Sequence, residues 1–225
     1  MFIGHFAAAF GAKKLAPGVS LGVLFLACQL ADLLWPNLVL LRLEHFAIDP
    51  GNTALTPLAF ESYPYSHSLV GLTIWSSLLA GAYWVLARSG PRAAAVIGGL
   101  VLSHWLLDVL THRADMPVAF DAATRIGLGL WNRPVAAIGT ELALFAAGVW
   151  LYARSTVARD RIGRIGLWAL VAFLAVAHIA NLLSPPPPST TTVAWSAQAM
   201  WLIVAWGYWI DGHRHARGGP PPRIA

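Results

Sequence analysis

The sequence predicts an all-α membrane protein, a polytopic bundle of about six transmembrane helices preceded by a short N-terminal helix. The chain has 225 residues, of which 57% are hydrophobic and only 11% are charged, and its mean hydropathy is +0.62. Soluble domains carry about 25% charged residues, so lipid is the expected solvent for most of this chain. Several apolar runs also reach the roughly 20 residues that a helix needs to cross the hydrocarbon core.

The first expected element is a short apolar helix over residues 2–14, which ends in the pair Lys13-Lys14. Its basic residues follow the apolar run instead of preceding it, which argues against a cleavable signal peptide. If this helix enters the bundle, His5 lies roughly 12 Å above the lysine pair, near the depth of other polar residues. If it lies on the membrane surface, His5 is excluded from the interior, and the sequence leaves both arrangements open.

The expected spans follow one another along the chain, separated by Gly, Pro and charged residues. They cover residues 18–43, 65–87, 93–112, 134–153, 163–183 and 193–210. The polar loop over residues 44–64 is long for a helical bundle, which favours a functional role. We expect one membrane-embedded helical domain over residues 1–215, with its metal site within residues 1–120, and a disordered tail over residues 216–225.

The basic residues are divided unequally between two alternating sets of connecting segments. The set of segments that includes both termini holds Lys13, Lys14, Arg88, Arg92, Arg154, Arg159, Arg161, Arg164, Arg214, Arg217 and Arg223. The other set holds Arg42, Arg113, Arg125 and Arg133. By the positive-inside rule, both termini are expected in the cytoplasm, and the loops over 44–64, 113–133 and 184–192 on the outer side. Because no single basic patch forms, we expect the lipid bilayer as a partner and no nucleic acid.

Three ionisable residues share one face of the third predicted span. His104, Asp108 and His112 are spaced by four residues, so on a helix they drift by only about 40° per step. Imidazole and carboxylate are common ligands of zinc and similar metals. An ionisable group at membrane depth is costly and is by default a functional hypothesis. The stripe therefore predicts a metal site, and the single cysteine, Cys28, excludes a four-cysteine zinc site.

Two further polar residues fall at a similar depth in the outer half of the bundle: Asp32 in the first span and His67 at the start of the second. An unpaired carboxylate in lipid costs several kcal/mol, so Asp32 needs a proton, a partner or a metal. The expected ligand set is His5, Asp32, His67, His104, Asp108 and His112. Six ligands exceed the needs of one tetrahedral ion, which favours several ions bridged by Asp32 or Asp108, with the other carboxylate as general base.

Two residues of the later spans have more than one interpretation. Glu141, in the fourth span, is compatible with a metal ligand, a base that orients a ligand, or a helix–helix hydrogen bond. His178, in the fifth span, is as compatible with a simple hydrogen bond to a neighbouring helix as with a functional role.

These residues carry a resemblance to a bacterial inner-membrane family of membrane-bound metal-dependent hydrolases. That family is similar to the zinc-dependent phospholipase C and single-strand nuclease superfamily. The matching elements are His5, Asp32, the pair His67-Ser68 and Ser103-His104-x-x-x-Asp108, all within residues 1–120. The chain departs from the family at Leu34, where the family commonly has a second Asp, and before Ser66, where it often has Arg-Gly. The resemblance implies a hydrolase in a bacterial inner membrane.

The expected function is hydrolysis of a phosphoester of a lipid or small molecule by a metal-activated water. Asp108 and Asp32 are the expected catalytic residues, and zinc is the expected metal, with manganese or iron as alternatives. Two other functions stay open: a proton- or cation-coupled transporter or channel, and a structural membrane protein stapled by a metal. The concentration of ionisable residues in one half of the membrane and the lack of an evident repeat favour the hydrolase.

Overall fold

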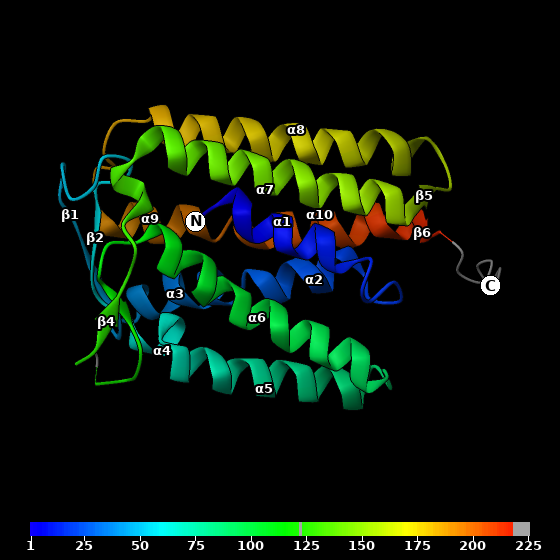
Figure 1. Cartoon of the computed structure of the whole chain (residues 1–225), viewed down its shortest axis with the longest axis horizontal. Coiled ribbons are helices and arrows are strands. Elements are labelled where there is room, and N and C mark those ends of the chain that lie inside the picture. The colour runs from blue at the N-terminus through cyan, green and yellow to red at the C-terminus, as the bar shows by residue number, and fades with distance from the viewer. Residues whose placement is uncertain (122, 218–225) are drawn as a thin grey trace.

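A computed structural model describes residues 1–121 and 123–217 and shows an elongated helical bundle (Figure 1). Among the described residues, four helices are long and apolar enough to cross a membrane: α5 (Leu69–Leu86), α6 (Pro91–Thr111), α7 (Pro134–Ser155) and α8 (Arg161–Leu183). A broken pair, α2 (Leu21–Cys28) and α3 (Leu30–Leu40), is a fifth candidate, bent by 54°. The predicted helical fold is confirmed, and the length and apolar composition of these helices are consistent with a membrane protein.

The sixth predicted span, over residues 193–210, is not one long helix. Its residues divide between α9 (Thr190–Ala197) and α10 (Met200–Gly212), with a break at Gln198 and Ala199. The break matches the bend at Gln29, because α9 packs against α3 whereas α10 packs against α2. Gln198 also donates a hydrogen bond from its amide to Asn37 Oδ1 at 3.1 Å. The structure therefore supports four or five spans, and six are not confirmed.

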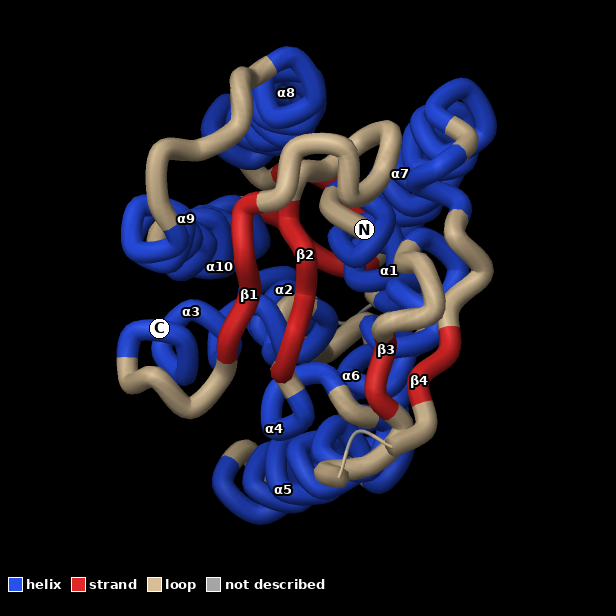
Figure 2. The backbone as a smooth tube through the Cα atoms, turned by 90° about the vertical axis from the view of Figure 1, so that its left-hand side faces the viewer, coloured by secondary structure: helices blue, strands red, loops and turns tan. Residues whose placement is uncertain are grey.

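Short antiparallel strand pairs close both ends of the bundle, a feature that the all-α prediction omits. At one end, β1 (His45–Ile48) pairs with β2 (Leu58–Ser62), and β3 (Met116–Pro117) pairs with β4 (Arg125–Ile126), as Figure 2 shows. The same end holds the one-turn helix α4 (Pro64–His67) and the 3₁₀ turn at Leu130–Asn132. At the opposite end, β5 (Thr156–Ala158) pairs with β6 (Arg214–Ala216). Ala216, which was expected in the disordered tail, lies in this last ladder, and residues 218–225 of that tail lie outside the described residues.

The first helix, α1 (Ile3–Ala12), lies inside the bundle between α6 and α7 (Figure 1). Phe6 and Phe10 of this helix are fully buried. The helix approaches α7 so closely that a Cβ at Gly148 would overlap the Ala7 carbonyl oxygen. The interior arrangement of the N-terminal segment is therefore the one adopted, and the surface arrangement is wrong.

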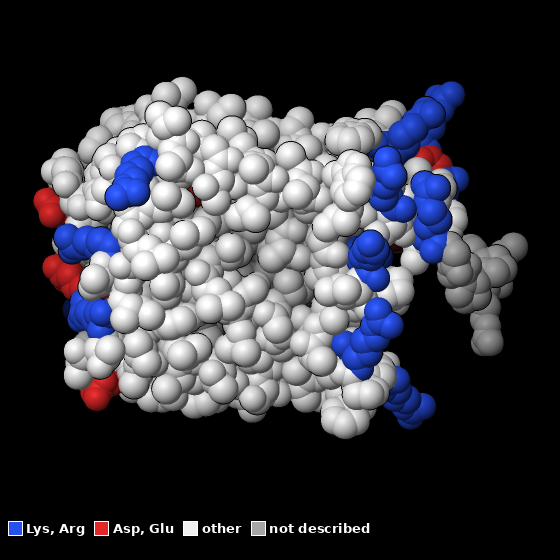
Figure 3. Space-filling model, in the orientation of Figure 1, with Lys and Arg blue, Asp and Glu red and all other residues white. Residues whose placement is uncertain are grey.

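On the face that Figure 3 shows, the charged surface residues gather at the two ends of the bundle and leave an uncharged band between them. The end with β5 and β6 carries mostly Lys and Arg, and the end with β1 to β4 carries both signs. Below, these are called the basic end and the mixed end. This distribution agrees with a protein that spans a membrane, and the cytoplasmic side remains a prediction of the positive-inside rule.

Candidate metal centre

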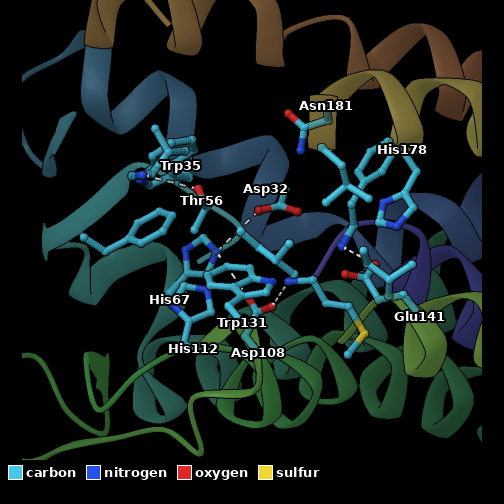
Figure 4. Close-up of a pocket in the computed structure, with 17 residues that line it drawn as sticks. Asp32, Trp35, Thr56, His67, Asp108, His112, Trp131, Glu141, His178 and Asn181 are labelled. Atoms are coloured by element: carbon cyan, nitrogen blue, oxygen red, sulfur yellow. Dashed lines mark hydrogen bonds and ion pairs between the residues drawn. The ribbon is translucent and has the colours of Figure 1, made fainter. Parts of the chain in front are cut away.

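A cavity of about 190 Å³ opens toward the mixed end, between α3, α7 and α8. Asp32, His67 and Asp108 form one side of it, and His178 and Asn181 of α8 lie across from them (Figure 4). The remaining wall is mainly apolar, and its larger side chains are Trp35, Leu55, Leu58, Phe60, Trp131, Ile138 and Leu182. A charged floor therefore meets an apolar wall within a single cavity.

Five of the six predicted ligands meet at this floor. The possible ligand atoms of His5, His104 and Asp108 lie within 4.8 Å of one another, and those of Asp32, His67 and His104 form a second such group. His104 belongs to both groups, so the five residues form one cluster. Its closest approaches are 3.1 Å from His104 Nε2 to Asp108 Oδ2 and 3.1 Å from His5 Nε2 to Asp108 Oδ1.

Four separate elements supply these side chains. Helix α6 places His104 and Asp108 one turn apart on its buried face. Asp32 lies in the first turn of α3, just after the bend at Gln29, and His67 lies at the end of α4. Because α1 enters the bundle, its His5 ring stacks on the His104 ring at 3.7 Å between centroids. The cluster thus depends on tertiary packing, which a periodic pattern does not encode.

The structure does not bring His112 into a ligand group with the other predicted ligands. Helix α6 ends at Thr111, and His112 is its C-cap residue, whose amide still donates to the Asp108 carbonyl oxygen at 2.8 Å. Its Nδ1 lies 2.9 Å from Asp115 Oδ1, and its ring packs against Trp131 at 4.2 Å between centroids. Burial lowers the pKa of His112 below the ordinary histidine value, even though Asp115 opposes this effect. His112 lines the cavity but belongs to neither ligand group.

The hydrogen bond at the far side of the His104 ring fixes its tautomer. Nδ1 lies 2.7 Å from the Cys28 carbonyl oxygen, which only accepts, so Nδ1 carries the hydrogen. In the neutral ring, Nε2 then presents a lone pair. This buried atom has no hydrogen-bond partner among the described residues, and it faces carboxylate oxygens of Asp108 at 3.1 Å and Asp32 at 3.7 Å. Electron-rich atoms at such distances repel unless a proton on Nε2 or a cation lies between them. With the ring neutral, the residues fit a bound metal.

His67 is oriented by a chain of two residues that sequence reasoning missed. Ser66 donates its hydroxyl hydrogen to Glu44 Oε2 at 2.5 Å, so the Ser66 oxygen accepts from His67 Nδ1 at 2.7 Å. Glu44 is buried, and its Oε1 accepts the Tyr65 and Ser66 amides at 2.8 Å each. The lone pair on His67 Nε2 then faces Asp32 Oδ1 at 3.5 Å. The only sequence signal for Glu44 was its place in the long polar loop.

The two carboxylates of the cluster differ in exposure and in partners. The Asp108 side chain is 3% exposed, and the Met1 amine and His5 both contact its Oδ1, the amine at 2.5 Å. The Asp32 side chain is 28% exposed and faces the cavity (Figure 4). Asp108 is therefore the centre of the cluster, and Asp32 is the carboxylate that meets the contents of the cavity.

Glu141 and His178 lie at the rim of the cluster and belong to neither ligand group. Glu141 Oε2 accepts the amides of Phe2 at 2.9 Å and Gly4 at 3.4 Å, which holds the start of α1 against α7. This contact matches the helix–helix hydrogen bond among the interpretations of Glu141. His178 stacks on Phe2 at 6.2 Å between centroids, and neither of its ring nitrogens has a hydrogen-bond partner among the described residues.

Comparison of the chain with protein-family models, with curated proteins and with solved structures finds no match. Neutral imidazole nitrogens and carboxylate oxygens form a donor set that suits zinc, manganese and iron.

Proposed function

We propose that this protein is a membrane-embedded, metal-dependent hydrolase that cleaves a phosphoester in the cavity at its mixed end. The observation that carries the proposal is the orientation of the His104 ring. Its Nδ1 hydrogen is committed to the Cys28 carbonyl, and its free Nε2 points at two carboxylates. An arrangement of this kind holds ligand atoms ready for a cation.

The side chains divide into two roles under this proposal. His5, His67, His104 and Asp108 are buried and would hold the metal, with Asp108 at the centre. When bound, a zinc-type ion would polarise a phosphoryl oxygen and lower the pKa of a water to about 7. Asp32 is part-exposed, so it is the residue placed to accept a proton from water in the cavity.

The walls of the cavity favour an amphiphilic substrate. The charged floor suits a phosphoester, whereas Trp35, Leu58 and Phe60 suit an alkyl chain. A neighbouring cavity of about 240 Å³ shares Leu55, Thr56, Leu58, Asn181 and Leu182 with the first and continues to the loop after α8. A lipid phosphoester therefore fits this space better than a wholly polar molecule.

The transporter alternative needs a polar path to the opposite end of the bundle. At the basic end, Lys13 and Asp211 form a buried ion pair at 2.6 Å. Between that pair and the metal cluster lies an apolar layer in which Phe25 contacts Phe6 at 4.9 Å and Phe10 at 5.1 Å between ring centroids. All three rings are fully buried. This layer separates the two polar clusters, which favours the hydrolase.

Metal content is the first test. Elemental mass spectrometry is applied to the protein purified in detergent without chelators, beside H104A and D108A. The exposed pair His45→Ala and Asp49→Ala serves as the matched control, because it removes the same residue types from the surface. We expect about one to three equivalents of zinc, manganese or iron in the wild type and in the control, and a loss in both site variants. A metal-free wild type would rule the proposal out.

Hydrolysis is the second test, on phospholipids and on soluble phosphoesters. Asp32→Asn is expected to lose activity, because the amide no longer accepts a proton, and to retain the metal held by the group that lacks Asp32, namely His5, His104 and Asp108. Three results together would overturn the hydrolase proposal: metal is present, its removal unfolds the protein, and no phosphoester is cleaved. The ion would then serve only to stabilise the fold.

A further inference from the structure

A separate cavity of about 690 Å³ lies on the flank of the bundle near the basic end. It opens between α1 and α6, with one side chain of α7 at its edge, and shares no lining residue with the cavity at the metal cluster. Its lining consists of Ala8, Gly11, Ala12, Lys14, Leu15, Arg92, Ala95, Val96, Gly99, Leu100, Ser103 and Leu151. Apart from the two cations, the lining is almost wholly apolar, and the cavity faces the space that a membrane would fill.

Small side chains on α6 hollow out this groove. Ala95 and Gly99 are exposed on its surface, and a Cβ built at Gly99 would meet nothing within 4 Å. From Arg92 to Ser103 the helix rises about 16 Å at 1.5 Å per residue. One leaflet of the hydrocarbon core is about 15 Å deep, so the groove runs along the depth of one leaflet.

Two cations stand at the mouth of the groove. Lys14 and Arg92 are exposed, and in the part of the chain that the structure describes neither makes an ion pair. Arg92 lies in the first turn of α6, where the helix dipole adds positive potential. A third cavity, of about 460 Å³, shares Leu15 and Arg92 with the groove and continues past Ser89 and Gly90. The positive potential is therefore located where the groove meets the membrane surface.

We propose that an anionic phospholipid binds in this groove, with one acyl chain along α6 from Arg92 to Ser103 and its phosphate at Lys14 and Arg92. Basic pockets between transmembrane helices are known to favour anionic head groups. The lipid would rest between α1 and α6, the helices that carry His5, His104 and Asp108. This proposal is independent of the hydrolase, because it uses none of the residues of the metal cluster.

The test is a lipid titration of delipidated protein in detergent, followed by native mass spectrometry. The probes are dioleoyl-phosphatidylglycerol and dioleoyl-phosphatidylcholine, which share their acyl chains and differ in net charge. We expect one phosphatidylglycerol per chain, bound at least about tenfold more tightly than phosphatidylcholine. Equal affinity for the two lipids would overturn the proposed charge recognition.

Two pairs of charge substitutions test the head-group contacts. Lys14→Gln with Arg92→Gln is expected to lower the phosphatidylglycerol affinity to that of phosphatidylcholine. Arg161→Gln with Arg164→Gln removes two exposed charges from the same end, outside the groove, and is expected to change nothing. If both pairs weaken binding equally, attraction is diffuse and the site is wrong.

The acyl groove is tested by filling it. Gly99→Leu is expected to reduce binding of both lipids by about tenfold or more. Gly139→Leu adds the same side chain to an exposed position on α7 with open space around it, and serves as the control. Circular dichroism checks that each variant is folded. If Gly99→Leu does not fold, the substitutions at Lys14 and Arg92 still test the site. Wild-type binding by folded Gly99→Leu overturns the groove.

Discussion

The Ser66 hydroxyl oxygen lies 2.7 Å from Nδ1 of His67 and, through its own hydrogen, 2.5 Å from Glu44 Oε2. Glu44 ends the loop that follows α3, so this chain of contacts joins the mixed end of the bundle to the metal cluster. It holds His67 with Nε2 toward Asp32. Residues that fix the far nitrogen of a ligating imidazole set both its tautomer and its basicity.

Removing this support should weaken metal binding without removing a ligand. Ser66→Ala and Glu44→Gln are each expected to lower metal affinity by about 10- to 100-fold. Competition with a chelator of known affinity measures the change. Ser77→Ala, which removes an exposed hydroxyl from α5, is the control. Unchanged affinity in both site variants would show that His67 needs no orientation, or that it is not a ligand.

The sequence located the long spans well because apolar length is a local property. Four predicted spans, over 65–87, 93–112, 134–153 and 163–183, correspond to α5, α6, α7 and α8 within a few residues at each end. The breaks in the other two spans escaped prediction because they arise between helices. Gln29 interrupts the first, and the α9–α10 break follows that bend.

The metal cluster was only partly predictable for the same reason. The spacing of His104 and Asp108 encodes a shared helical face, and this pair lies together. The same spacing put His112 in the ligand set, but its Nδ1 contacts Asp115 of the following loop, and periodicity within a helix carries no information about such a contact. The position of His5 depended on whether α1 enters the bundle, and that is decided by its packing against α7.

The close approach of α1 and α7 makes Gly148 critical. A Cβ at this position would overlap the backbone of Ala7, which has no side-chain rotamer with which to relieve the clash. Gly148→Ala is expected to destabilise the protein by about 1–3 kcal/mol or more, and to weaken metal binding because α1 carries His5. Thermal unfolding in detergent and metal content measure the two effects.

The matched control for Gly148→Ala is Gly139→Ala on the same helix, where an added Cβ meets nothing within 4 Å. In a helix, alanine is favoured over glycine by roughly 1 kcal/mol, so this variant should be neutral or slightly more stable. Equal stability of the two variants would show that α1 moves freely away from α7.

Acidification should destabilise the protein in part through His112. Burial lowers the pKa of this residue in the folded state, so below about pH 6.5 the unfolded chain takes up a proton that the folded chain does not. Folding free energy is then lost as the pH falls, by at most about 1.4 kcal/mol per pH unit from this group. Unfolding temperatures between about pH 7 and pH 5 should fall less steeply for His112→Asn than for the wild type. Parallel curves would show that His112 is not held neutral.

Removing only one partner of the buried ion pair at the basic end should destabilise the protein more than removing both. Lys13 Nζ lies 2.6 Å from Asp211 Oδ2, their side chains are 5% and 10% exposed, and Tyr152 donates to Asp211 Oδ1 at 2.8 Å. Lys13→Met leaves the carboxylate with the Tyr152 hydroxyl, and a loss of about 3–5 kcal/mol is expected. Lys13→Met with Asp211→Leu should recover much of that loss, because no uncompensated charge remains. The control is His213→Ala, which breaks the more exposed pair with Asp160 and should change the free energy of unfolding little. If the losses of the two single substitutions simply add in the double variant, Lys13 and Asp211 are not coupled.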